Sequence, residues 1–158
     1  MRTTIDNVLK GMLALLMIIM VFSTLLQVFA RMLSLNILFT EELTIYSMMW
    51  VTLFGSAYAF GVQKHIAIDA LKAVLKTELK WKLEILVELI IALFAVLILI
   101  LGGSWFVYIT FKLGQVSSVI QVPKGWIYLA LPVSGVIILV YNALNISDTF
   151  KNRMNEPG

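Results

Sequence analysis

Two adjacent acids, Glu41 and Glu42, are the first residues of this chain whose types could do chemistry. Paired carboxylates act as general acid and base when both reach one substrate atom. Neighbouring residues of a helix point about 100° apart, so these two carboxylates do not converge, and catalysis here is excluded. Two roles stay open. The acids could complement a helix dipole, with Thr40 as N-cap, or form an ion pair within or between proteins, for which Arg31 is the nearest candidate.

A second pair of acids, Glu84 and Glu88, stands at positions i and i+4 where another apolar stretch begins. An ionised group inside a membrane is costly and often marks an ion pathway or a buried pair. Glu88 lies one turn deeper and is the acid that a proton-coupled carrier would need. Because both acids occupy the first turns of the helix and not its middle, we expect them to complement the helix dipole and reach the membrane interface.

The single histidine, His65, is followed one helical turn later by Asp69. At this spacing the carboxylate can orient the imidazole on one helix face. One histidine cannot build a polyhistidine metal cluster, and the chain has no cysteine, which excludes thiolate metal sites and cysteine nucleophiles. We therefore interpret the pair as a structural corner and expect no catalytic residue, cofactor or metal ion in this chain.

Composition indicates which elements must hold these residues. Of 158 residues 61% are hydrophobic and only 13% are charged, against about 25% charged in a soluble domain. We predict an all-α integral membrane protein with a single membrane domain, residues 1–158. Four segments are long enough, at about 1.5 Å per residue, to cross a hydrocarbon core of about 30 Å. The predicted crossings are residues 11–30, 43–62, 83–111 and 125–146, with a cytoplasmic tail at 147–158.

Lysine and arginine residues predict the orientation, because short cytoplasmic loops are enriched in them. Nine fall on one side and three on the other, which predicts that both termini are cytoplasmic. A cleaved signal peptide would leave three crossings, but the first apolar segment exceeds the usual h-region of about 7–15 residues. The nine are Arg2, Lys10, Lys64, Lys72, Lys76, Lys80, Lys82, Lys151 and Arg153, and the three are Arg31, Lys112 and Lys124.

Residues 66–80, between the second and third crossings, have the pattern of an amphipathic helix on a membrane surface. An apolar stripe and a charged stripe repeat side by side at helical spacing. We expect the apolar stripe to face the acyl chains and the lysines to face anionic headgroups; packing on a partner protein is the alternative. The stripes are Ile68, Leu71, Leu75 and Leu79, and Asp69, Lys72, Lys76 and Lys80.

The order of several motifs along the chain follows the pattern of a known family. These are Arg31, Glu41, Glu42, Leu43, Trp50, Gly55, His-Ile-Ala-Ile-Asp at 65–69 and Val-Pro-Lys-Gly-Trp-Ile-Tyr at 122–128. With four crossings and this length, the chain resembles the small membrane subunit of tripartite ATP-independent periplasmic (TRAP) transporters, the DctQ-like component. The resemblance extends over most of the chain.

The resemblance implies that the substrate chemistry lies in other chains. In such transporters a periplasmic binding protein delivers an organic acid, of the C4-dicarboxylate or sialic acid class. A large polytopic subunit holds the substrate and sodium sites and moves by an elevator motion, while the small subunit is a scaffold in the inner membrane of a bacterium or archaeon. The residues implied to contact the large subunit or the binding protein are Arg31, Glu41, Glu42, Trp50 and Gly55.

Two other classes of protein stay open. An autonomous four-helix proton-coupled carrier, acting as a homodimer, would need a membrane-embedded acid, and only Glu88 could serve because the first crossing has none. A small membrane enzyme lacks a catalytic constellation, whereas an assembly factor without a transport role is compatible with the sequence.

The lysines of the predicted surface helix allow a first test. Changing Lys72, Lys76 and Lys80 together to glutamate should weaken the stability of the membrane-embedded protein, by about 1 kcal/mol per lysine, in anionic lipid. The effect should be smaller in neutral lipid. Thermal unfolding in nanodiscs of each lipid measures both, and an equal effect in the two lipids would contradict binding to headgroups.

Overall fold

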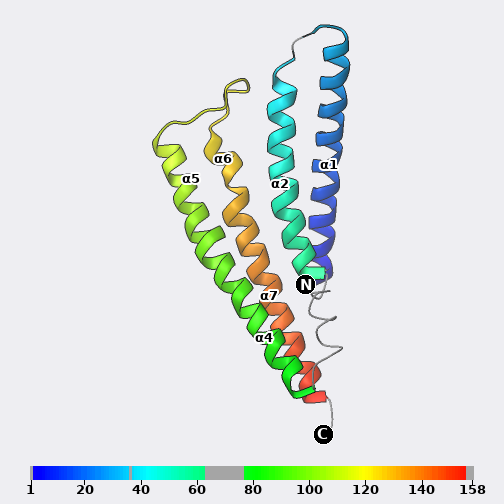
Figure 1. The fold of residues 1–158 in the computed structure, drawn as a ribbon, viewed down its shortest axis with the longest axis vertical. Coiled ribbons are helices and arrows are strands. Elements are labelled where there is room, and N and C mark those ends of the chain that lie inside the picture. Colours follow the sequence, from blue (N-terminus) through cyan, green and yellow to red (C-terminus); the bar gives the residue numbers. More distant parts are fainter. Residues whose placement is uncertain (1, 36, 63–76, 156–158) are drawn as a thin grey trace.

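A computed structural model of the protein describes residues 2–35, 37–62 and 77–155 (Figure 1). Regular structure in these ranges is helical, apart from an isolated β-bridge between Val116 and Pro123. The helices are α1 (Arg2–Met32), α2 (Phe39–Val62), α4 (Thr77–Phe94), the π-helix η1 (Ala95–Gly102), α5 (Gly103–Lys112), α6 (Lys124–Tyr128) and α7 (Ala130–Asn155). Four stretches are long and apolar enough to cross a membrane: Arg2–Met32, Phe39–Gly61, Ile85–Lys112 and Lys124–Thr149. The predicted all-α fold with four membrane-capable helices is confirmed.

The helices extend beyond the apolar segments that predicted them. Residues 147–155, expected to be a polar tail, continue α7 as helix, because no proline or glycine interrupts them before Pro157. Residues 66–76 of the expected surface helix lie outside the described ranges, and 77–80 form the first turn of α4. The surface helix and the orientation of the termini therefore remain predictions.

The crossing helices stand in a row rather than in a closed bundle (Figure 1). Contacts between helices follow the order α1, α2, α7, and then the continuous helix made by α4, η1 and α5. The beginning of α1 and the end of α7 lie at one end of the row, which we call the terminal end. Residues 33–35, 37–38 and 113–123 lie at the opposite end, which we call the loop end. In this row the crossing Lys124–Thr149, formed by α6 and α7, is the most enclosed. In its most apolar stretch 39% of the residues are buried, against 6% in the crossing Arg2–Met32.

Small residues let α7 approach its two neighbours closely. A Cβ atom added at Gly135 would lie 2.8 Å from Leu99 Cβ and 3.3 Å from the carbonyl oxygen of Ala95 in η1. On the other side, the ring of Tyr141 covers Gly61 of α2. The buried apolar core, Ala57, Ala95, Leu99 and Ile138, lies between these contacts. Such close approach supplies the van der Waals packing that holds helices together in lipid.

Local sequence explains where the helices end at the loop end. After α1, Leu35 N–H donates to Ala30 O at 2.9 Å and Ser34 N–H to Arg31 O at 3.1 Å, with Ser34 at φ 57°. This is a Schellman motif with a serine in the left-handed position. The break between α6 and α7 has a different cause: Pro132 has no N–H to offer the carbonyl of Tyr128, so helix geometry is interrupted at Leu129.

Gly135 provides a test of the close contact between α7 and η1. Gly135→Ala should lower stability by about 1–3 kcal/mol, because the methyl group meets Ile100 Cγ1, Leu99 Cβ and the backbone, none of which is the far end of a flexible side chain. Gly11→Ala is the matched control. Nothing lies within 4 Å of a Cβ there, so better helix propensity should stabilise α1 by about 0.5–1 kcal/mol. Thermal unfolding in detergent measures both, and equal shifts would contradict the close contact between α7 and η1.

Candidate functional site

The α5–α6 connection forms a small self-contained hairpin at the loop end. Its first residues close α5 by a second Schellman motif, in which Gly114, at φ 60°, supplies the left-handed position. Two backbone hydrogen bonds of 2.9 Å, from Ser117 N–H to Val122 O and from Lys124 N–H to Gln115 O, pair its two arms. Gln121 adopts φ 61° and turns the chain. The amide groups of residues 118–120 are thereby left out of the pairing.

Glu42 of α2 receives these free amides. Its carboxylate accepts hydrogen bonds from the N–H groups of Ser118 (2.9 Å), Val119 (3.2 Å) and Ile120 (3.0 Å), and from the hydroxyl of Ser117. We call this arrangement the Glu42 cradle. All four partners are donors, so the site fits an ionised carboxylate, which only accepts. Successive amides of this kind form an anion-binding nest, and here the anion is part of the same chain.

The expected roles of the residues around Glu42 change accordingly. Among the described residues Arg31 forms no ion pair and is exposed, as is Glu41. Thr40 does not cap α2: its hydroxyl donates to Ile37 O at 2.9 Å, and its own carbonyl accepts from Ser23 at 3.0 Å. Sequence reasoning missed the true partner of Glu42 because three of the four donors are backbone groups, which every residue type carries.

A second polar cluster joins four helices at the terminal end. Arg2 of α1 pairs with Asp148 of α7 at 2.9 Å, donates to Asn145 at 3.3 Å and also donates to the carbonyl of Gly61 in α2. One turn further along α1, Asp6 accepts a hydrogen bond from the hydroxyl of Tyr141. We call this set, together with Glu88 and Asn142, the terminal cluster.

Glu88 is buried in this cluster, with 7% of its surface exposed. The side-chain amide of Asn142 donates to its carboxylate and, at 2.7 Å, to its backbone carbonyl, and Asn145 donates to the carboxylate at 3.1 Å. The sequence predicted a carboxylate that extends to the membrane interface; in the structure α7 encloses it inside the row, and its depth in a membrane stays a prediction. The signal that could have found it is the pair of asparagines at i and i+3 in an otherwise apolar crossing.

The described side chains around Glu88 pack closely against it. The depression that Glu88 shares with Phe60, Ile138 and Tyr141 has no room for a water-sized sphere. Among the residues the structure describes, no group of three His, Asp or Glu side chains could hold a metal ion. The geometry of the terminal cluster is thus that of a structural contact between helices.

The remaining predicted site residues are dispersed. Trp50 is half-buried and stacks edge-on against Phe54, with ring centroids 5.0 Å apart. Gly55, also half-buried, lies beside Leu13 of α1. Four others, His65, Asp69, Lys72 and Lys76, lie outside the described residues, and Lys80 belongs to α4.

The fold and the two clusters define a class of protein, a polytopic helical membrane protein in which Asp6, Glu42, Glu88 and Asp148 bond other segments of the same chain. The chain matches the family model of "Tripartite ATP-independent periplasmic transporters, DctQ component" over residues 20–152. It therefore belongs to the DctQ family and is a small component of a TRAP transporter, an inner-membrane assembly with a large membrane subunit and a periplasmic binding protein. No curated protein matches the chain significantly.

The terminal cluster predicts a stability effect at Asn142. Asn142→Leu keeps the number and connectivity of the side-chain heavy atoms but removes two donors from buried Glu88, which should destabilise the protein by about 1–3 kcal/mol. Asn7→Leu is the matched control, because Asn7 is exposed on α1, and its effect should stay within about 0.5 kcal/mol. Thermal unfolding in detergent compares the two, and similar effects would contradict a structural role for the asparagine.

Proposed function

We propose that this chain is the scaffold subunit of a sodium-coupled TRAP transporter that imports an organic acid of the C4-dicarboxylate or sialic acid class. It braces a large elevator-type subunit, which carries the substrate and sodium sites. Membership in the DctQ family supports the assembly. The observation that carries the scaffold role is that Glu42 and Glu88 are both engaged by donors of the same chain.

The proposed orientation places the terminal end in the cytoplasm and the loop end in the periplasm. The excess of lysine and arginine on the side of the termini supports it. In this orientation Arg31 and Glu41, which are exposed at the loop end, are available to the large subunit or to the docked binding protein. Glu42 contributes indirectly by fixing the α5–α6 hairpin, and Trp50 and Gly55 divide their surfaces between internal packing and a partner.

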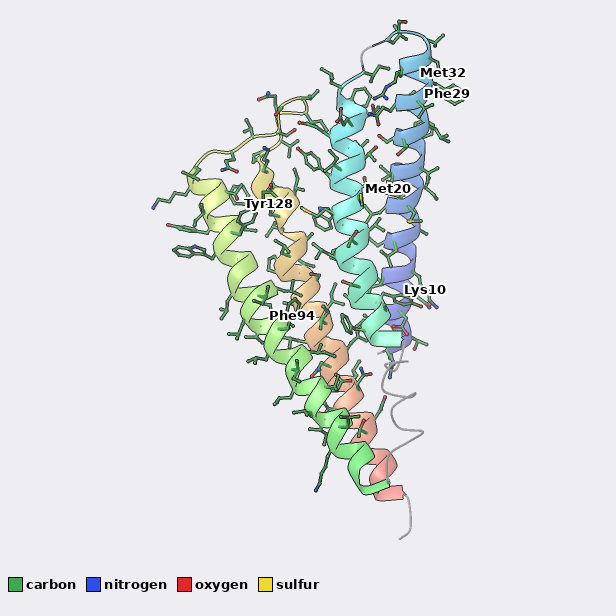
Figure 2. All side chains as sticks on the ribbon, in the orientation of Figure 1. Lys10, Met20, Phe29, Met32, Phe94 and Tyr128 are labelled. Carbon is green, nitrogen blue, oxygen red and sulfur yellow. The ribbon has the colours of Figure 1, made fainter. Side chains whose placement is uncertain are left out.

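The two outer edges of the row suit a brace. Large apolar side chains along α1, including Phe29 (61% exposed) and Met32 (76%), point away from α2 (Figure 2). On the opposite edge, Leu89 and Trp105 are 64% and 65% exposed. Surfaces of this composition take acyl chains or apolar helices of a partner. The predicted surface helix at 66–80 would add contact with anionic headgroups on the cytoplasmic side.

One observation keeps an autonomous proton-coupled carrier as a second candidate: Glu88 is a buried acid in a crossing helix. Such a carrier would work as a homodimer without other subunits. The two candidates differ in what must copurify with the chain and in what Glu88 must do.

Copurification tests the assembly. A tagged chain, extracted from native membranes in mild detergent, should bring down a large polytopic protein in stable stoichiometry, as identified by mass spectrometry. Recovery of the chain alone as a dimer would contradict the scaffold role.

Uptake tests Glu88. Reconstituted with its partner subunits, Glu88→Gln should keep sodium-driven uptake of the organic acid within about twofold per assembled complex, since the Oε1 atom of a glutamine can still accept from the side-chain amide of Asn142. If vesicles that contain this chain alone take up the organic acid, and if Glu88→Gln abolishes that uptake, the chain is an autonomous carrier instead.

A further inference from the structure

The two halves of the row are joined very differently at their two ends. One half is the α1–α2 hairpin, and the other is α4, η1, α5, α6 and α7. Helix packing joins the halves through α2 and α7. Toward the loop end, α2 and the α5–α6 segment diverge (Figure 1), and there Glu42 reaches across to the hairpin.

We propose that the Glu42 cradle is a latch. Seated on Ser117 and the three amides, the carboxylate holds the α5–α6 hairpin against α2 and closes the loop end of the row. When the carboxylate leaves the cradle, the halves part at the loop end and pivot about the terminal cluster. This proposal concerns the chain itself and does not depend on the transporter that it serves.

The hydrogen bonding of the hairpin allows such a latch to open without local unfolding. The bonds between Ser117 and Val122 and between Lys124 and Gln115 pair its arms independently of Glu42. Gln121 adds a side-chain bond to Ser118 O at 3.2 Å. The amides of residues 118–120 belong to exposed residues, so water can replace the carboxylate when it leaves. The Glu42 side chain thus controls the contact between α2 and the α5–α6 hairpin, and breaking that contact leaves the hairpin intact.

The terminal cluster is the natural pivot because several side chains share the task there. Arg2 of α1 donates to Asp148 and Asn145 of α7. Asp6 of α1 accepts from Tyr141 of α7, so three hydrogen bonds cross between the halves at this end, and Glu88 holds α4 against α7 within one half. These contacts also lie beside Gly61, where the ring of Tyr141 brings α2 and α7 into close contact. Opening that end would break these contacts together, whereas the described polar contacts between the halves at the loop end all go to the Glu42 carboxylate.

Distances between spin labels test the latch. The chain has no cysteine, so labels attach only at introduced cysteines. Leu38→Cys and Lys112→Cys place a pair across the loop end at exposed positions, and Thr3→Cys and Ser147→Cys place a pair across the terminal end. The full chain is reconstituted in lipid nanodiscs, and pulsed electron–electron double resonance gives the distributions of the distance between the two spin labels.

Three variants are measured on this background. Glu42→Gln places an amide N–H₂ group among four donors and should lengthen and broaden the loop-end distance. Glu41→Gln is the matched control, since it removes the same charge from the exposed neighbour, and should leave the distance unchanged. Ser117→Ala removes one donor and keeps every charge, so it should give a smaller shift in the same direction. The terminal-end distance should be constant in all three.

Three outcomes would overturn the latch. One is an unchanged loop-end distance in Glu42→Gln. Another is an equal shift in Glu41→Gln, which would indicate a general effect of charge. The third is a matching shift of the terminal-end pair, which would indicate loosening of the whole row. If Glu42→Gln fails to insert, Ser117→Ala decides, and no shift there overturns the proposal.

Discussion

The architecture depends on how closely α7 can lie between its two neighbours. In a bilayer, lipid chains are as apolar as the helices, so burying apolar surface does little to bring helices together. Contact must come from packing at short range, and α7 achieves it through Gly135 against Leu99 on one side and Tyr141 over Gly61 on the other. Larger residues at Gly135 or Gly61 would push the helices apart and leave both polar clusters without their partners.

Close packing also fixes the geometry that the polar groups need. The side-chain amide of Asn142 reaches both the carboxylate and the backbone carbonyl of Glu88 only because α4 and α7 are adjacent along this stretch. Removing such a donor leaves a buried acceptor without its partner, at a cost larger than the net gain of an ordinary hydrogen bond. The hydrogen bonds of the terminal cluster therefore depend on close helix packing. In turn they fix the axial positions of α1, α4 and α7 relative to one another.

Sequence reasoning predicted the crossings because apolar length is a strong local signal, and the turn after α5 carries one too, in Gly114. It missed the left-handed Ser34, because serine gives no sign of that conformation. It also missed the site geometry. Glu42 bonds amides some 75 residues later in the chain, and Glu88 bonds side chains 54 and 57 residues away. Such contacts follow from the order of helices in the row, which composition and periodicity do not contain.

The two carboxylates illustrate how the same group serves different ends of a membrane protein. Glu88 is enclosed by side-chain amides from a neighbouring helix, so its position is fixed by helix packing. Glu42 is bound chiefly by backbone amides of a surface hairpin, so it can leave its site without breaking a hydrogen bond inside any crossing helix. In the proposed scaffold role, with the loop end in the periplasm, this asymmetry would be useful, because one end of the row would keep its shape while the end that meets the binding protein would have a single point of release.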